Sequence, residues 1–188
     1  MARLTKQDWL KKGLQVLSTK GYNSLRLEYL CEQLSVTRGS FYHHFEEMND
    51  YVDKLMEHWE AGSNAIMDSV AKTDVLPLER LNLLQNKVFD ISAKEEVVIR
   101  AWATFNPTVT KYIRRIDRKR IDFITDLYIE EGIPEHAADA TARIEYAMYI
   151  GVQNLHFNGS KKETQNLYQD FEYVLIKYGK EKVGRPKS

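Results

Sequence analysis

A short polar segment carries the side chains best suited to chemistry. It begins at Thr37, a residue type that caps helices, and continues as the start of a short helix. An arginine can bond to guanine or to a phosphate, small hydroxyl groups can reach either, and a glycine lets a helix lie close to a DNA backbone. The segment therefore offers six candidate DNA-contacting residues: Thr37, Arg38, Gly39, Ser40, Tyr42 and His43.

Three short helices are predicted to position this segment. The first has a capping signature at Thr5–Asp8, an apolar stripe from Leu10 to Leu17, and a stop at Gly21. Ser24 can cap the second, and Thr37 can cap the third, which is expected to run through Phe45. Two helices joined by a tight turn, the second one polar at its start, are the arrangement that places a helix in the major groove.

The same periodicity also fits a structural bundle of three helices whose polar third helix only faces water. Charge adds a weak argument for a polyanion partner. The whole chain of 188 residues has a net charge of zero, but residues 1–45 carry seven Lys or Arg and three acids. A small basic head on a slightly acidic body suits a module that binds a polyanion.

The rest of the chain predicts longer helices and no strands, so the fold class is all-α. Apolar stripes at helical spacing follow one another from Asn49 to Gly179, separated at prolines and glycines. We expect a helix-turn-helix domain at 1–48, a larger helical domain at 49–179, and a basic, disordered tail at 180–188. No apolar run approaches about 18 residues, so no membrane partner is expected. The single cysteine, Cys31, fits a reducing cytosol.

The segment Leu34–Phe45 resembles the helix-turn-helix of TetR-family transcriptional regulators. It has a Val, a hydroxyl residue, a basic residue, Gly, a second hydroxyl residue, an aromatic residue and then Tyr-x-x-Phe. The resemblance implies an all-α regulator, commonly a repressor, that binds a pseudo-palindromic operator in double-stranded DNA as a homodimer. It also implies a larger ligand-binding and dimerisation domain, with a small-molecule effector that releases the DNA. Ser35 stands where the family often has Gly, and Met48 where it usually has Lys.

The larger domain offers two further sets of candidate residues. Aromatic side chains can line a cavity for the unknown effector, although they fit an ordinary core as well: Trp59, Phe89, Trp102, Phe105 and Tyr146. An apolar repeat in the last two long helices suits a dimer interface, although it also fits this chain's own core: Ile144, Met148, Gly151, Leu155, Leu167, Phe171 and Val174. An internal salt bridge is expected among Arg100, Asp117 and Arg120.

Two other classes of function stay open at this point. One is a helical interaction module that does not recognise a DNA sequence. The other is a helical enzyme that uses scattered carboxylates, for which the candidates are Glu95, Glu96, Asp117 and Asp122. The chain has no phosphate-binding loop and no nucleophile motif, so we expect no enzyme. The adjacent His43 and His44 point to different sides of a helix, so no metal or other cofactor is expected.

Overall fold

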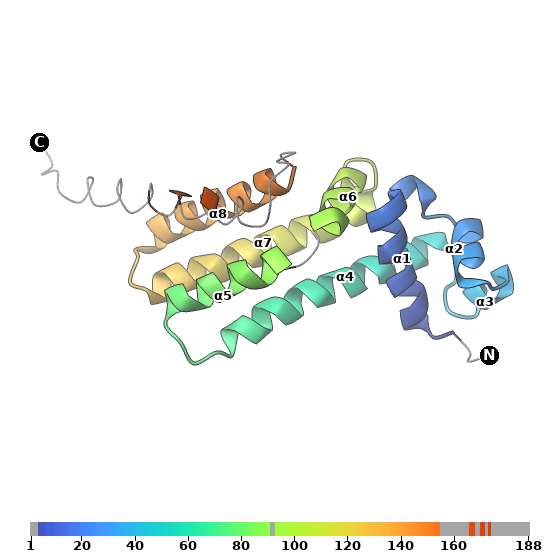
Figure 1. Ribbon diagram of the computed structural model, residues 1–188, viewed down its shortest axis with the longest axis horizontal. Helices are drawn as coiled ribbons and strands as arrows, with labels where there is room; N and C mark the ends of the chain where they lie inside the picture. The colour runs from blue at the N-terminus through green and yellow to red at the C-terminus, as the bar shows by residue number, and fades with distance from the viewer. Residues whose placement is uncertain (1–3, 91–92, 155–165, 168–169, 172, 174–188) are drawn as a thin grey trace, which may run out of the picture. The chain divides into compact units, whose positions relative to one another are not determined.

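The computed structural model describes residues 4–90, 93–154, 166–167, 170–171 and 173. Every regular element in this part of the chain is a helix, as expected (Figure 1). The chain divides into two compact units, residues 1–147 and 148–188. The elements are α1 (Lys6–Lys20), the 3-10 helix η1 (Tyr22–Ser24), α2 (Leu27–Leu34), α3 (Arg38–Tyr42), α4 (Met48–Ala71), α5 (Pro77–Asp90), α6 (Ala93–Ala103), α7 (Pro107–Glu130) and α8 (Glu135–Asn154).

The predicted signals at both ends of α1 are confirmed. Thr5 accepts a hydrogen bond from the backbone N–H of Asp8, and the carboxylate of Asp8 accepts one from the N–H of Thr5 at 2.8 Å. This reciprocal capping satisfies two backbone donors that a helix leaves without partners, and it lowers the pKa of Asp8. Gly21 ends the helix with φ of 77°, a conformation that a glycine adopts without strain.

The predicted ends of the next two helices need correction. Ser24 does not cap α2, because it lies in η1 and its hydroxyl donates to the carbonyl of Lys20. The N-cap of α2 is Arg26, which makes no side-chain capping bond. The third helix, α3, ends at Tyr42 and not at Phe45, since the chain turns toward α4 immediately afterwards.

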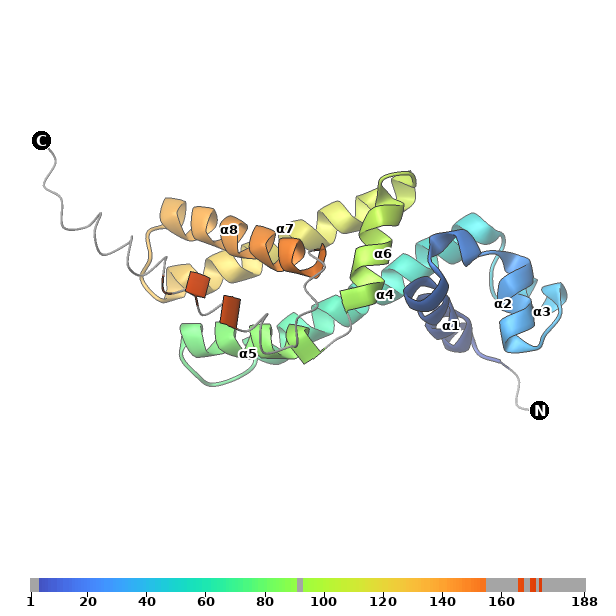
Figure 2. The same ribbon diagram turned by 45° about the horizontal axis from the view of Figure 1, so that its top comes forward.

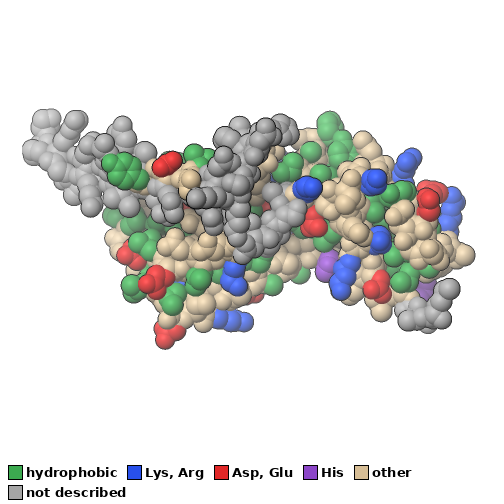
Figure 3. Space-filling view, viewed as in Figure 1, with side chains coloured by type: hydrophobic (Ala, Val, Ile, Leu, Met, Phe, Trp, Pro, Cys, Tyr) green, Lys and Arg blue, Asp and Glu red, His purple; other side chains and the backbone are tan. Residues whose placement is uncertain are grey.

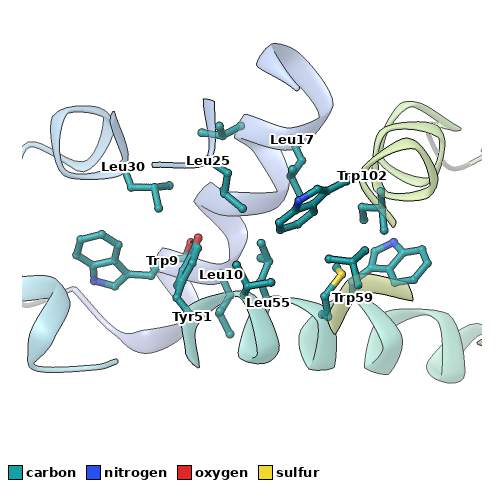
Figure 4. Close-up of a cluster of buried hydrophobic side chains, with 14 of the residues drawn as sticks. Trp9, Leu10, Leu17, Leu25, Leu30, Tyr51, Leu55, Trp59 and Trp102 are labelled. Atoms are coloured by element: carbon teal, nitrogen blue, oxygen red, sulfur yellow. Dashed lines mark hydrogen bonds between the residues drawn. The ribbon is translucent and has the colours of Figure 1, made fainter. Parts of the chain in front are cut away.

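The core of the first three helices continues into the long helices. Trp9, Leu17, Leu30 and Phe41 are fully buried in a cluster that also includes Ile116 of α7. Figure 4 shows the side chains of this cluster converging from α1, α2, α4 and α6. One continuous core therefore fixes the N-terminal helices against α4 and α6.

Helix α1 approaches α4 closely because Gly13 lies at their contact. A Cβ atom at Gly13 would lie 2.2 Å from the hydroxyl oxygen of Tyr51 and 3.0 Å from a methyl group of Leu55. The Tyr51 hydroxyl donates a 2.9 Å hydrogen bond to the carbonyl of Trp9, and burial raises the pKa of Tyr51. Gly13 thus belongs to the core for steric reasons, not merely as part of an apolar stripe.

The long helices α4 and α7 run side by side in the same direction (Figures 1 and 2). Tyr112 donates to Asp53, and further along both helices Arg120 donates to Ser63. A second apolar cluster joins α5, α7 and the first turns of α8, and it includes Leu81, Leu127, Tyr128, Ala138 and Ala142. Among the described residues, no helix is long and apolar enough to span a lipid bilayer.

Candidate nucleic-acid interface

A left-handed residue makes the turn between α2 and α3. Ser35 has φ of 55° and ψ of 45°, and it is the one non-glycine residue with positive φ in the described part of the chain. Its N–H donates to the carbonyl of Glu32 at 3.1 Å, and the next N–H, from Val36, donates to Cys31 at 3.0 Å. These bonds close the end of α2, so the turn forms without the glycine that the resemblance would place there.

Helix α3 is anchored through one buried aromatic residue. The ring of Phe41 is fully buried and lies 5.4 Å from Trp9, 5.6 Å from Tyr51 and 5.1 Å from Phe45, between ring centroids. Because a helix of five residues buries only one side, the remaining residues of α3 face outward. The neighbouring ring of Tyr42 is 57% exposed.

All six predicted DNA-contacting residues lie on or directly beside this outward surface. Thr37, Arg38, Gly39, Tyr42 and His43 are exposed, and Ser40 is half-buried. Thr37 is the N-cap of α3 through its backbone, but its hydroxyl makes no capping bond. That hydroxyl therefore remains available to an external partner.

Gly39 has no neighbour that requires a glycine. A Cβ atom there would meet only the hydroxyl oxygen of Thr37, at an ordinary 3.7 Å, and its backbone is helical. The protein's own packing thus leaves space above this residue, in contrast to Gly13. Space above the first turn of a recognition helix is where a DNA backbone would approach.

One partner of Arg38 was not predicted from the sequence. The guanidinium of Arg38 donates to the carboxylate of Glu28 in α2 at 2.6 Å. Both side chains are about two-thirds exposed, with values of 64% and 63%. Exposed pairs of this kind contribute about 0–1 kcal/mol, so Arg38 can leave Glu28 at low cost when a base or phosphate replaces it.

The start of α4 is acidic, where the resemblance suggested a basic residue. Glu47 is the N-cap, and the backbone N–H of Glu46 already donates to the carboxylate of Asp50 at 3.1 Å. The negative charges of these acids repel a phosphate from a helix N-terminus that would otherwise attract one. Basic residues instead lie on the N-terminal helices, where Figure 3 shows Lys and Arg side chains with a few acids among them.

Comparisons with known proteins agree with this geometry. Residues 10–53 match the model of the bacterial regulatory proteins of the tetR family. The transcriptional regulator AcuR from Cereibacter sphaeroides is 32% identical over 83 residues, which cover 44% of this chain and 38% of AcuR. In this N-terminal region the chain is similar to the regulators of the tetR family. The match to AcuR spans well under half of that regulator's length.

Solved structures of TetR-family regulators share the fold over most of the chain. A regulator from Agrobacterium tumefaciens has a TM-score of 0.75 at 20% identity and covers 88% of this chain and 94% of its own. One from Legionella pneumophila has a TM-score of 0.72 at 11% identity, covering 82% and 87%. These likenesses favour a transcriptional regulator over the enzyme that uses scattered carboxylates.

The predicted effector residues have different neighbours, although Trp59 and Trp102 belong to one buried cluster. Trp59 and Tyr146 are buried beside the guanidinium of Arg120, which lies 5.8 Å from the Trp59 ring and donates to the Tyr146 hydroxyl at 3.1 Å. Trp102 and Phe105 instead lie beside Tyr22, with ring centroids 6.4 and 6.5 Å away. The side chain of Phe89 lies outside the described residues.

A partly buried ion cluster surrounds Tyr146, and the expected internal salt bridge is part of it. Arg100 donates to Glu96 at 2.7 Å and to Asp117 at 2.6 Å, and Arg120 donates to Glu96 at 2.5 Å. Burial disfavours the charge of Arg100, but its bonds to Asp117 and the surrounding charges outweigh burial and raise its pKa. Burial also raises the pKa of Tyr146, whose hydroxyl donates to Asp117 at 2.7 Å.

The predicted dimer residues are only partly described. Ile144 is 52% exposed, although it is a large apolar residue in the middle of α8. Met148, Gly151, Leu167 and Phe171 are half-buried within the second unit, and a Cβ atom at Gly151 would meet nothing within 4 Å. Leu155 and Val174 lie outside the described residues.

Proposed function

We propose that this chain regulates transcription by binding a pseudo-palindromic operator in double-stranded DNA as a homodimer. The observation that carries the proposal is the surface of α3, where Thr37, Arg38 and Tyr42 face outward over a fully buried Phe41. In helix-turn-helix proteins the residues at the start of the second helix contact base edges in the major groove. We also propose that the chain acts in the cytoplasm, where it would meet genomic DNA.

A homodimer is favoured by the length of α3 and by an exposed face of α8. A recognition helix of five residues makes few base contacts, and two heads about 34–36 Å apart would double them. Ala140, Ile144 and Ala147 form one exposed stripe on α8. Small residues around one large apolar side chain suit a close crossing with a second copy of the helix.

The effector domain is proposed to be the helical body at 49–179, with the head at 1–48 and the basic tail at 180–188. Two of the aromatic residues predicted for an effector site, Trp59 and Tyr146, lie beside the ion cluster, so a small molecule entering there would meet charged groups as well as rings. The side-chain oxygens of Asn64 and Thr125 are buried in this body without a hydrogen-bond partner. We propose that effector binding releases the operator, which makes the chain a repressor.

In vitro selection from random DNA duplexes tests the DNA-binding proposal. The full chain should enrich a sequence with two related half-sites, and Arg38→Ala and Tyr42→Phe should weaken binding to it. Loss of a base contact by Arg38 costs about 1–3 kcal/mol, and loss of a phosphate contact reduces the salt slope by about one. Arg143→Ala removes an exposed cation from α8 and is the matched control.

If the selection enriches no sequence, or if Arg38→Ala and Arg143→Ala bind DNA equally well, the interaction module is favoured instead.

The proposed dimer is tested by sedimentation. Ile144→Glu should give monomers, whereas Leu76→Glu, at an equally apolar position 68% exposed beyond α4, should remain dimeric. An Ile144→Glu variant that remains dimeric would place the interface elsewhere.

A further inference from the structure

An open groove of about 910 Å³ lies along α7, away from the proposed DNA surface. The end of α6, the turn at Thr104–Asn106 and the first four turns of α7 form its walls. It shares no residue with the recognition surface of α3. Its volume falls in the range of about 300–1,000 Å³ that small-molecule sites occupy.

Five cationic side chains line this groove, and one acid does. The cations are Lys111, Arg114, Arg115, Arg118 and Lys119, and the acid is Asp122. Arg115 donates a hydrogen bond to the carboxylate of Glu60, and a carboxylate oxygen of Asp122 lies 3.9 Å from Nε of Arg118. Within the described part of the chain, the other three cations form no ion pair or hydrogen bond. The groove therefore holds an excess of positive charge that the protein itself does not neutralise.

The groove also contains an aromatic ring that packing does not explain. Phe105 is 77% exposed, the highest value among the large apolar side chains that the structure describes. It lies at the turn before α7, with its ring centroid 6.5 Å from that of Tyr22. An exposed large aromatic ring beside unpaired cations offers a flat apolar surface and a charged one to the same ligand.

We propose that this groove binds a small polyanion that also carries an aromatic ring, such as a nucleoside polyphosphate. Lys111 and Arg118 are seven residues apart on one side of α7, so their positions span about 10 Å at 1.5 Å per residue. A row of cations of this length matches a chain of two or three phosphates. The ring of the ligand stacks on Phe105, at the end of the row where α7 begins and its dipole is positive.

The ligand site is separate from the helical core in which the effector residues Trp59 and Tyr146 lie. Its charge also differs, because the ion cluster in that core balances two arginines against two acids. A ligand of the groove is therefore a polyanion, whereas the core has no excess charge to attract one. The proposal does not depend on DNA binding by the chain.

Calorimetric titration of the full chain with adenosine triphosphate and with inorganic triphosphate tests the site. We expect both to bind, with adenosine triphosphate tighter. Arg114→Ala combined with Arg118→Ala should weaken both at least about tenfold, since charge-assisted contacts are lost. Phe105→Ala should weaken only adenosine triphosphate. Lys54→Ala combined with Arg143→Ala removes two cations outside the groove and should change nothing.

Circular dichroism shows whether each variant is folded. If the variant with both Arg114→Ala and Arg118→Ala unfolds, the variant with both Lys111→Ala and Lys119→Ala is used in its place. If neither adenosine triphosphate nor inorganic triphosphate binds with a dissociation constant below about 1 mM, the proposal is wrong. Equal losses in the groove variant and the control variant would overturn it as well. If triphosphates do not bind and the groove variant loses affinity for duplex DNA, the groove is a DNA contact and not a small-molecule site.

Discussion

Replacing Gly39 by alanine separates the folding of the head from its contact with DNA. The added Cβ would lie 3.7 Å from the hydroxyl oxygen of Thr37 and near no other atom. Gly39 is also within α3 and has no positive φ, so alanine fits its backbone. The variant should therefore fold as the natural chain does.

The two expected effects have opposite signs. Alanine is more favourable than glycine inside a helix by up to about 1 kcal/mol, so unfolding of the free protein should become slightly harder. In the complex, the methyl group would occupy the space into which the DNA backbone fits. Overpacking of this kind costs about 1–3 kcal/mol, which corresponds to a loss of about 5- to 150-fold in affinity per head.

Thermal unfolding and operator titration at one fixed salt concentration measure these effects on the same sample. Gly62→Ala is the control, because Gly62 is another helical glycine with open space around it, in α4 and away from α3. It should gain similar stability without losing affinity. Full operator affinity in Gly39→Ala would refute the close approach of DNA to this turn, even if the protein binds DNA by other residues.

Three further substitutions test the geometry of the head. Gly13→Ala should lower the free energy of unfolding by at least about 2 kcal/mol in denaturant titration, and Tyr51→Phe should restore part of it by removing the clashing hydroxyl. Ser35→Gly should raise that free energy by up to about 1 kcal/mol, because it relieves the left-handed conformation; a loss would show that the serine side chain stabilises the turn. Glu28→Gln should leave stability unchanged but strengthen binding to random DNA and steepen its salt dependence by up to about one, since Arg38 is freed; an unchanged slope would contradict this.

Local signals in the sequence predicted most of the helices. The capping box at Thr5 and Asp8 set the start of α1, Gly21 set its end, and Pro107 marked the start of α7. Each of these signals acts within one or two turns of its own helix, so it does not depend on the tertiary structure. The start of α2 and the end of α3 were harder to predict from the sequence. A 3-10 helix precedes α2, and the tertiary packing of Phe41 constrains α3.

The partners of the charged residues could not be predicted in this way. Glu28 and Arg38 are ten residues apart on different helices, and they meet only because the turn at Ser35 folds α3 back beside α2. Opposite charges at that distance in sequence carry no periodic signal. The same reasoning applies to Arg115, whose partner Glu60 lies 55 residues earlier in α4.

The ion cluster around Tyr146 shows why the number of aromatic residues alone was an incomplete guide to the chemistry of this core. The number of aromatic residues predicted an apolar cavity. In the structure, however, the hydroxyl of Tyr146 donates a hydrogen bond to Asp117, and the guanidinium of Arg120 lies over the ring of Trp59. Removing one member of a buried pair leaves an uncompensated charge and costs about 3–5 kcal/mol, whereas an exposed pair costs about 0–1 kcal/mol. An effector that enters this core must therefore satisfy the hydrogen bonds it displaces, which selects for polar groups on the ligand as well as for apolar surface.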